Sequence, residues 1–441
     1  MRALSKPFKR APEVHAPVVI ERSEHNISRK QISTAALKVL YRLKSEGFDA
    51  YLVGGGVRDL LLGESPKDFD IATNAKPEQV RGLFKNSRMI GRRFVIVHVV
   101  FGREIIEVTT FRAPPRPRDI DPDGRIRSDN NYGDIASDAA RRDFSINALY
   151  YNIADFSVTD FFGGLQAIKD KKIRFIGDPA TRYQEDPVRG LRALRFAAKL
   201  GFELDDDAFE ALSFARDNLE QIPAARLYEE AMKLFLSGHG EASLDALLDG
   251  DLLFTLFPTV DERLQDHEEQ FEAFIRATLV NTDQRVQEGR SVQPGFLFAA
   301  FLWADVKDRA DDIAPGGHTQ VQAVLSAADI ILAQQTKYTA CPKRFTQPAI
   351  DVWVLQARMA TARGKRVERI VEHPKFRAAV DFLKLRDAVG EDHGLDLQYW
   401  VELADQIPPA PVRQRRFDDD EQGERPRRRS NQRRRGKKTP E

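Results

Sequence analysis

Residues 51–73 read YLVGGGVRDLLLGESPKDFDIAT, a stretch in which three glycines separate a short apolar run from a second apolar segment. Ala50–Val53 is typical of a buried strand, and Val57–Leu62 of the start of a helix. Glycines before a helix N-terminus let the backbone approach an anion, and the free N–H groups favour phosphate. We therefore expect Gly54 and Gly55 to form a phosphate site, with a plain tight turn as the alternative. The pattern is neither a Walker loop nor GxGxxG.

Two aspartates, Asp68 and Asp70, follow in the same stretch. We expect a strand to begin near Asp68, and side chains two residues apart on a strand project to the same face. Paired carboxylates repel one another unless a cation lies between them, and Mg²⁺ prefers oxygen ligands. Two such ions about 4 Å apart are a recurrent device for phosphoryl transfer. The alternative is a solvated acidic pair at a strand edge, which the nearby glycine turn makes the weaker explanation.

A hairpin is predicted next, with strands at Phe94–Phe101 and Ile105–Phe111 and a turn at Gly102. Glu107 lies in the middle of the second strand. It either joins the two aspartates as a third carboxylate or faces solvent, and the sequence favours neither.

The segment 138–149, DAARRDFSINAL, has apolar residues at helical spacing opposite a polar face. We predict a helix whose polar face carries Arg141, Arg142, Asp143 and Asn147. Its arginines are suited to bind a triphosphate or a ribose as forked donors. The alternative is a charged helix face with internal Asp–Arg pairs, and the spacing alone favours that alternative.

A second charged helix is predicted from about Arg182, with Glu185, Asp186, Arg189 and Arg192 on one face. A carboxylate one turn from a guanidinium presents an acceptor beside a forked donor. Adenine and cytosine both carry an exocyclic amine beside a ring acceptor, so such a pair suits either base. A surface ion pair is the commoner explanation of this spacing.

The composition limits the class of protein. The chain has 441 residues with a formal net charge of +1, and its one cysteine, Cys341, excludes an internal disulfide framework. No apolar run reaches the roughly 20 residues that span a membrane. The N-terminal region lacks the apolar core of a secretory signal. We therefore expect a soluble protein of several domains in the cytoplasm.

The C-terminus is strongly basic. Residues 425–438 hold nine Lys or Arg and no Asp or Glu, a composition that cannot build a core. We predict a disordered tail that binds the phosphates of RNA or DNA. A localisation signal or a merely solubilising tail are the alternatives. The candidate RNA contacts are Arg427, Arg428, Arg429, Arg433, Arg434 and Arg435.

Four motifs occur in the order and spacing of one known family. They are LVGGGVRDLLLG with KDFDIAT (52–73), IIEVTTFR (105–112), DAARRDFSINALYY (138–151) and EDPVRGLRALRFAAKLGF (185–202). Together they resemble the class II nucleotidyltransferases, the family of bacterial poly(A) polymerases and tRNA CCA-adding enzymes. The resemblance covers about residues 30–240, and the remainder more weakly.

The resemblance implies a role for each motif. The catalytic Mg²⁺ ions, or Mn²⁺ in their place, would be held by Asp68 and Asp70, with a third acidic residue at Glu107 or Asp138. The triphosphate of ATP would be gripped by Gly54, Gly55 and Arg58. The ribose and phosphates would be contacted by Arg141, Arg142, Asp143 and Asn147. The incoming base would be read by Asp186 and Arg189, supported by Glu185 and Arg192.

Patterns and resemblance together predict an α+β fold, with an N-terminal nucleotidyltransferase head built on a small mixed β-sheet and an all-helical remainder. The expected units are a mobile basic arm at 1–26, a catalytic head at 27–165, a helical neck with the base-reading helix at 166–240, a helical RNA-binding body at 241–408 and the disordered basic tail at 409–441.

The implied reaction is template-independent addition of AMP from ATP to RNA 3′ ends, with release of pyrophosphate. Addition of CCA to tRNA is the alternative, because the Asp–Arg pair suits adenine or cytosine. The basic tail and the segments at 91–112 and 225–238 resemble the polyadenylating branch. A non-catalytic RNA-binding protein on the same scaffold is the third hypothesis, which the intact motifs oppose. RNA-decay or RNA-chaperone proteins are expected partners.

Overall fold

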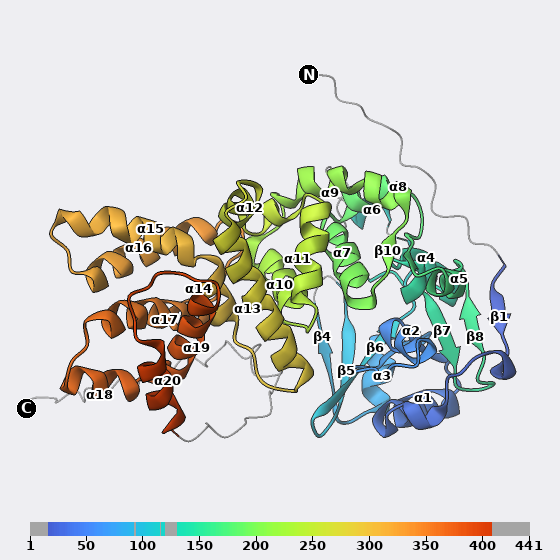
Figure 1. The fold of residues 1–441 in the computed structure, drawn as a ribbon. Coiled ribbons are helices and arrows are strands. Elements are labelled where there is room, and N and C mark those ends of the chain that lie inside the picture. Colours follow the sequence, from blue (N-terminus) through green and yellow to red (C-terminus); the bar gives the residue numbers. More distant parts are fainter. Residues whose placement is uncertain (1–15, 92–93, 115, 120–129, 408–441) are drawn as a thin grey trace, which may run out of the picture.

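The computed structural model describes residues 16–91, 94–114, 116–119 and 130–407. Within these residues, a mixed sheet and its helices form one end of the molecule, and helices alone form the other (Figure 1). The predicted α+β fold is therefore confirmed. The predicted tail at 409–441, with its six candidate arginines, and the first part of the predicted arm lie outside the described residues.

The head sheet has eight strands in the order β1-β8-β7-β2-β3-β6-β5-β4. All neighbouring pairs are antiparallel except β3 and β6, which are parallel. The predicted hairpin is confirmed, since β5 and β6 pair across a turn at Gly102. The strands are β1 (Val18–Ile20), β2 (Ala50–Val53), β3 (Asp70–Thr73), β4 (Ser87–Ile90), β5 (Ile96–Phe101), β6 (Glu104–Thr110), β7 (Leu149–Asn152) and β8 (Val158–Asp160).

Helices cover both faces of the head sheet. One face packs on α1, α2 and α3 through a buried apolar cluster that includes Leu40, Val57, Val80 and Ile106. The opposite face packs on α4 through a smaller cluster around Tyr150. The head helices are α1 (Thr34–Ser45), α2 (Gly55–Leu61), α3 (Pro77–Leu83), α4 (Ile135–Arg141) and α5 (Gly164–Lys169).

The helical part begins beside a short parallel pair, β9 (Lys172–Ile173) with β10 (Glu203–Leu204). Its first helices are α6 (Pro179–Glu185), α7 (Val188–Leu200), α8 (Asp206–Glu210), α9 (Leu212–Leu219), α10 (Ala224–Phe235), α11 (Gly240–Asp249) and α12 (Pro258–Gln265). The remaining helices are α13 (Glu269–Gln287), α14 (Pro294–Phe301), α15 (Trp303–Ile313), α16 (Gln320–Gln335), α17 (Lys343–Thr361), α18 (Lys365–Val371), α19 (Phe376–Ala388) and α20 (Leu397–Asp405).

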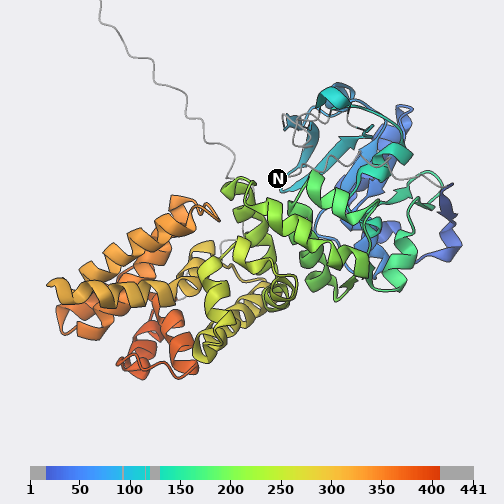
Figure 2. The ribbon, with the colours of Figure 1, turned by 90° about the horizontal axis from the view of Figure 1, so that it is seen from above.

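One continuous apolar core runs from the edge of the head into these helices. It extends from Phe144 to Phe382, and a smaller cluster around Trp400 joins α17 to α20. The head lies at one end and the C-terminal helices at the other, with α7 to α13 between them (Figure 2). Because the core is shared, the helices between the two ends hold the head in a defined position.

Two expectations from the composition concern membrane-spanning helices and the single cysteine. No helix among the described residues is long and apolar enough to cross a membrane. The sulfur of Cys341 is partly buried, and burial raises the pKa of its thiol to about 12. The thiol is therefore unreactive at neutral pH, because the thiolate is the reactive form.

Candidate active site

The glycine turn lies at the end of β2 and opens α2. Gly54 has a φ of 75°, which residues with a Cβ rarely adopt, so the position requires glycine. A Cβ atom built on Gly54 would lie 3.5 Å from Nη1 of Arg142 and 3.8 Å from Oδ2 of Asp70. The turn therefore places bare backbone between a guanidinium and a carboxylate, where a charged ligand can approach closely.

Asp70 and Glu107 lie side by side on the parallel strands β3 and β6. Their neighbours Ile71 and Val108 are buried in the cluster under α1, so alternation directs the two carboxylates to the opposite face of the sheet. Burial, followed by the charge of Glu107, raises the pKa of Asp70 to about 6, although Arg142 opposes the shift. The two carboxylates thus repel one another in a partly dry environment.

Asp68 approaches these two carboxylates from a loop. The strand begins at Asp70 rather than near Asp68, so the alternation argument for the aspartates does not apply. Asp68 is exposed, yet its charge contributes to the raised pKa of Asp70. Burial and the charge of Asp68 also raise the pKa of Glu107. The three acidic side chains therefore share one electrostatic field, which a cation would relieve.

The acidic group fits a metal that is shared with a substrate. Within the described part of the chain, no three His, Cys, Asp or Glu side chains form a metal-binding cluster by themselves. Mg²⁺ in phosphoryl transfer is commonly bound by one or two carboxylates together with substrate phosphates. Glu107 is also engaged by Nε2 of His98 at 3.4 Å, so the two aspartates are the better ligands.

Arg142 is held over this site by Asp138 and Tyr150. Its Nε donates to the Tyr150 hydroxyl at 3.0 Å, and its Nη2 donates to Oδ2 of Asp138 at 3.2 Å. Burial alone would lower the pKa of Arg142, but Tyr150, Asp138 and Asp70 raise it above its ordinary value. Asp138 is thus engaged by a cation and a hydroxyl, which favours a positioning role over a place among the metal ligands.

The prediction of one helix over residues 138–149 is wrong. Helix α4 ends at Arg141, Arg142 is extended, a 3₁₀ turn spans Ser145–Asn147, and β7 begins at Leu149. Leu149 and Tyr150, which suggested a helix face, instead enter the sheet beside β2, and Ile146 lies in the 3₁₀ turn. Tertiary pairing outweighs local periodicity here. The break lets Arg142 face the carboxylates while Asp143 points toward α7.

Asp143 joins the head to α7 through a buried polar network. Its carboxylate accepts from Nε of Arg192 at 3.0 Å and from Nδ2 of Asn147 at 3.3 Å. Asn147 in turn accepts from Nη1 of Arg58 at 2.6 Å. Arg58 is 2% exposed and also contacts Asp59, so the geometry favours support of the network over direct grip of a phosphate.

The prediction of one helix from Arg182 is also wrong. Helix α6 ends at Glu185 and α7 begins at Val188, with Asp186 in an extended conformation between them. Pro187 is the physical reason, because the residue before a proline is excluded from the helical region. Glu185, Asp186 and Arg189 therefore lie at a junction of two helices, and Arg192 lies one turn further along α7.

Asp186 and Arg189 have separate partners at this junction. Oδ2 of Asp186 accepts from Nη2 of Arg226 at 2.6 Å, across from α10. Nη1 of Arg189 donates to Oε2 of Glu185 at 2.8 Å and to the carbonyl of Arg182 at 2.9 Å. Both groups are thereby oriented before a ligand arrives, as a base-reading pair requires.

Sequence reasoning missed three arginines of the site, namely Arg112, Arg182 and Arg226. Arg112 donates from its backbone to Asp138 at 3.1 Å, and Arg182 donates to the carbonyl of Arg141 at 3.0 Å. Burial, followed by the charge of Arg189, lowers the pKa of Arg182 to about 10. Its i,i+3 spacing from Glu185 is a signal that could have revealed it. The partner of Arg226 lies forty residues away, so no local pattern could reveal it.

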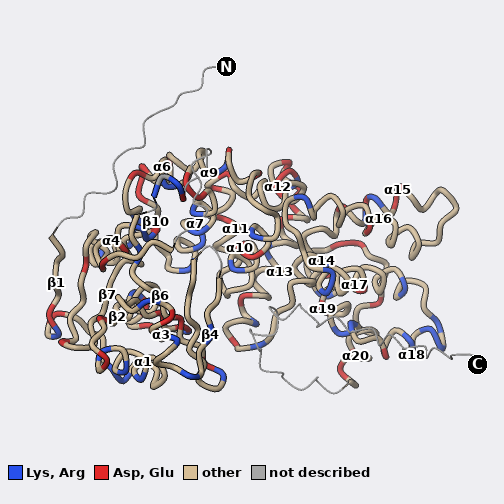
Figure 3. Tube along the Cα trace, turned by 180° about the vertical axis from the view of Figure 1, so that it is seen from behind, with Lys and Arg blue, Asp and Glu red and all other residues tan. Residues whose placement is uncertain are grey.

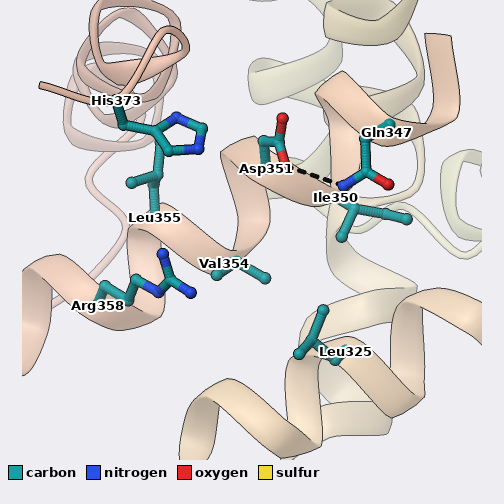
Figure 4. A pocket seen from close by; sticks show the side chains of 8 residues that line it. All are labelled: Leu325, Gln347, Ile350, Asp351, Val354, Leu355, Arg358 and His373. Atoms are coloured by element: carbon teal, nitrogen blue, oxygen red, sulfur yellow. Dashed lines mark hydrogen bonds between the residues drawn. The ribbon is translucent and has the colours of Figure 1, made fainter. Parts of the chain in front are cut away.

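Two hollows in the described part of the chain lie away from these side chains. The smaller, of about 200 Å³, lies between α16 and α17 and is lined by Leu325, Ile350, Val354 and the polar Arg358 and His373 (Figure 4). Its other polar groups, Asp351 and Gln347, bond to each other at 3.0 Å, which leaves a small and largely apolar space. The larger lies between α7, α8 and α11.

Comparisons with known proteins agree with this geometry. Residues 50–174 match the model of the Poly A polymerase head domain, 201–264 that of the probable RNA and SrmB-binding site of polymerase A, and 316–436 that of the polymerase A arginine-rich C-terminus. Poly(A) polymerase I of Salmonella typhimurium is 46% identical over 402 residues, which cover 89% of this chain and 86% of that protein. The chain belongs to the poly(A) polymerase family.

Other members of the poly(A) polymerase family and related enzymes extend the comparison. Poly(A) polymerase I of Haemophilus influenzae is 41% identical, with 87% of this chain and 86% of that protein covered. A CCA-adding enzyme of Bacillus pumilus is 36% identical over only 55% of this chain and 60% of that protein. The family resemblance is therefore confirmed, and among these three relatives the two polymerases match most of the chain and the CCA-adding enzyme about half of it.

Solved structures share the fold of this poly(A) polymerase family member. A tRNA-processing enzyme in its apo form superposes with a TM-score of 0.56 at 20% identity, covering 87% of this chain and 94% of that one. A CCA-adding enzyme in its apo form gives a TM-score of 0.51 at 19% identity, covering 87% of this chain and 81% of that one. These similarities show a common arrangement of head and helices.

Proposed function

We propose that the chain adds AMP from ATP to RNA 3′ ends without a template, as a polynucleotide adenylyltransferase. The observation that carries this proposal is the placement of Asp70 and Glu107 beside each other at the Gly54 turn, with Arg142 on its other side. The relatives named Poly(A) polymerase I, which match most of the chain, support it.

Asp68 and Asp70 are the proposed ligands of Mg²⁺, or of Mn²⁺, with Glu107 beside them. When bound, such ions supply positive charge that activates the attacking hydroxyl and stabilises the leaving oxygen. Burial, followed by the charges of Glu107 and Asp68, raises the pKa of Asp70 to about 6, and a cation between the carboxylates would offset this shift. The crowding of the carboxylates on neighbouring strands supports this assignment.

The remaining residues bind and orient the nucleotide. The RNA 3′-hydroxyl attacks the α-phosphate, so that a new phosphorus–oxygen bond forms, the bond to the β-phosphate oxygen breaks, and pyrophosphate leaves. We assign the phosphates to the Gly54 and Gly55 backbone and to Arg142. A hydrogen-bonded network holds this part of the head against α7, and it consists of Arg58, Asn147, Asp143 and Arg192. Arg141, the last residue of α4, lies just before Arg142.

Base recognition is assigned to the junction of α6 and α7. Asp186 would accept from the exocyclic amine of adenine, and Arg189 would donate to the ring, since both are held in place by Arg226 and Glu185. Both groups are also compatible with cytosine. For this reason the choice of ATP over CTP is the most detailed part of the proposal, and incorporation from each triphosphate tests it directly.

The proposed division of labour follows the predicted units. The head at 27–165 carries the chemistry, the neck at 166–240 reads the base, the body at 241–408 contacts RNA, and the tail at 409–441 adds non-specific grip on phosphates. The cytoplasm, where ATP and RNA meet, is the proposed compartment. Association with RNA-decay or RNA-chaperone proteins stays a prediction.

The deciding experiment supplies the purified chain with Mg²⁺, an unstructured RNA and each nucleoside triphosphate in turn. Long tails from ATP alone are the expected result. Addition of C and A confined to tRNA that lacks its CCA end would establish the CCA-adding alternative instead. Binding of RNA with no incorporation from any triphosphate would establish the non-catalytic alternative. An Asp70→Asn variant serves as the inactive control.

A further inference from the structure

A groove of about 650 Å³ lies on the neck, away from the proposed active site. Its walls come from α7, α8 and α11 and from the strand β10. Apolar side chains line much of it, among them Leu194, Phe202 and Leu204. Phe209 also lines the groove, and it is 46% exposed. A groove with apolar walls that is open to solvent is a candidate docking site for a polypeptide, provided that its polar lining matches the partner.

Carboxylates dominate the polar lining of this groove, where Lys172 is the one basic side chain. Two carboxylates are already paired, since Glu203 bonds to Lys172 at 3.0 Å and Asp245 bonds to Arg276 at 2.8 Å. The other three are exposed, and their side chains have no hydrogen bond or ion pair with any described residue. They are Asp206, Glu210 and Asp249.

A groove that combines apolar walls with exposed carboxylates favours an occupant that is cationic and partly apolar. RNA is disfavoured, because the five carboxylates of the lining outnumber its one basic side chain and would repel phosphates. An arginine side chain fits all the features, since its guanidinium pairs with carboxylates and stacks on an aromatic face while its stem packs on apolar surface. The chain makes such stacks elsewhere, for example Arg195 over Phe196 at 4.4 Å.

We propose that this groove is a docking site for the chain's own arginine-rich C-terminal segment, residues 412–441. Charge complementarity is the first argument. The block at 425–438 carries nine Lys or Arg and no acidic residue, whereas both signs are interspersed along the described chain (Figure 3). The segment thus supplies the charge that the groove lacks.

Reach is the second argument. The groove helix α11 packs on α13, α13 packs on α19, and α19 packs on α20, which ends the described chain. Packed helices lie about 10 Å apart and the 19-residue α13 is about 28 Å long, so this path places the groove within roughly 60 Å of the start of the tail. Arg425 follows Ile407 by eighteen positions, and an extended chain of that length spans up to about 60 Å.

Docking would compete with RNA for the same arginines. A tethered segment meets its site at an effective concentration in the millimolar range, so weak surface ion pairs suffice to hold it. RNA with many phosphates would displace it, and short or scarce RNA would not. The groove would thereby raise the concentration of RNA that the tail needs for binding. This regulatory part rests on the proposed function, whereas the docking itself does not.

Peptide binding tests the docking directly. A synthetic peptide of residues 412–441 is titrated into chain that ends at residue 411, which retains every residue of the four buried clusters. The peptide should bind, and the triple variant Asp206→Asn, Glu210→Gln, Asp249→Asn should weaken binding about tenfold, the sum expected of three surface ion pairs. Equal binding to both proteins, or no binding, overturns the proposal.

A matched control separates the groove from general charge. The variant Glu220→Gln, Glu262→Gln, Asp329→Asn removes three exposed carboxylates outside the groove lining and should leave peptide affinity unchanged. Unstructured RNA provides the second readout. The groove variant should bind it about tenfold more tightly in the full chain and equally in the shortened chain. Equal tightening in both would mean that the carboxylates merely repel RNA, which overturns docking.

Discussion

Asp143 and Arg192 lie forty-nine positions apart, and Oδ2 of Asp143 accepts hydrogen bonds from Nε and Nη2 of Arg192. Burial by itself would raise the pKa of Asp143, but Arg192 and its other donors hold that pKa below the ordinary value. The pair joins the residues that follow α4 to the middle of α7. This ion pair, together with the bonds from Arg182 to the carbonyls of Arg141 and Arg142, fixes the proposed phosphate site relative to the proposed base site.

Arg192→Ala should lower the free energy of unfolding by about 3 kcal/mol, because it leaves a buried carboxylate without its cation. Urea unfolding followed by circular dichroism measures this loss. The control is Arg216→Ala, which breaks an exposed pair with Asp251 and should cost under about 1 kcal/mol. Equal losses in the two variants would show that the Asp143 pair is not structural.

Asp70→Asn should reduce AMP incorporation at least about 100-fold, since it removes negative charge where the proposed metal binds. RNA affinity should stay within twofold, because Asp70 is not a proposed RNA contact. The control is Asp49→Asn, the same chemical change at the opposite end of β2, where the carboxylate bonds only to Asn74 among the described side chains. Incorporation near the parent level in Asp70→Asn would refute the metal assignment.

Arg226→Ala should lower kcat/KM for ATP roughly 10- to 100-fold and reduce the preference for ATP over CTP, because Asp186 loses the group that orients it. Single-nucleotide incorporation with each triphosphate measures both effects. Arg226→Lys keeps the charge and loses the fork, so it should fall between the parent and the alanine variant. An unchanged ATP:CTP ratio in all three proteins would exclude Arg226 from base selection.

Glu391 should make stability depend on pH. Its carboxylate accepts from Arg386 at 2.7 Å and from Lys307 at 3.0 Å. Burial by itself would raise the pKa of Glu391, but these two partners lower it to about 2. A depressed folded-state pKa means that the pair stabilises fully above the unfolded value of about 4.3 and loses this contribution as pH falls toward 2. Glu391→Gln should therefore cost about 1–3 kcal/mol at pH 7 and less at pH 3. A constant difference across this range would contradict the assignment.

Removal of residues 412–441 should weaken binding of unstructured RNA and flatten the dependence of log K on log salt concentration. Each arginine that contacts a phosphate adds about 0.7 to that slope for a single strand, because it releases a counterion. Filter binding at several salt concentrations gives the slope. A slope identical to that of the full chain would exclude the tail from RNA contact.

Local chemistry predicted the parts of the fold that depend on neighbours in sequence. The strand before Gly54 and the hairpin around Gly102 follow from apolar runs and glycine conformations. The two wrong helices failed for different reasons. Pro187 is a local signal for a break, because the residue before a proline avoids the helical conformation, whereas Leu149 enters a strand only because β2 offers a partner.

The candidate site shows the same division. The motifs contain the residues that meet at the Gly54 turn, but their periodicity alone did not show that Asp138 faces Arg142 rather than the other carboxylates. Burial of Arg58 and the contact between Asp186 and Arg226 depend on elements packed from far along the chain. Such relationships are invisible to spacing, because they are set by tertiary packing.

The parallel pairing of β3 with β6 has a consequence for how the protein comes to be active. Parallel neighbours need a crossover, and here α3, β4 and β5 lie in the connection and are synthesised before β6 can dock beside β3. Asp70 and Glu107 meet only at that late, non-local step, which is slow in folding because loop entropy is lost first. A chain still emerging from the ribosome therefore has separate carboxylates, and nucleotidyl transfer begins only when the whole head is complete.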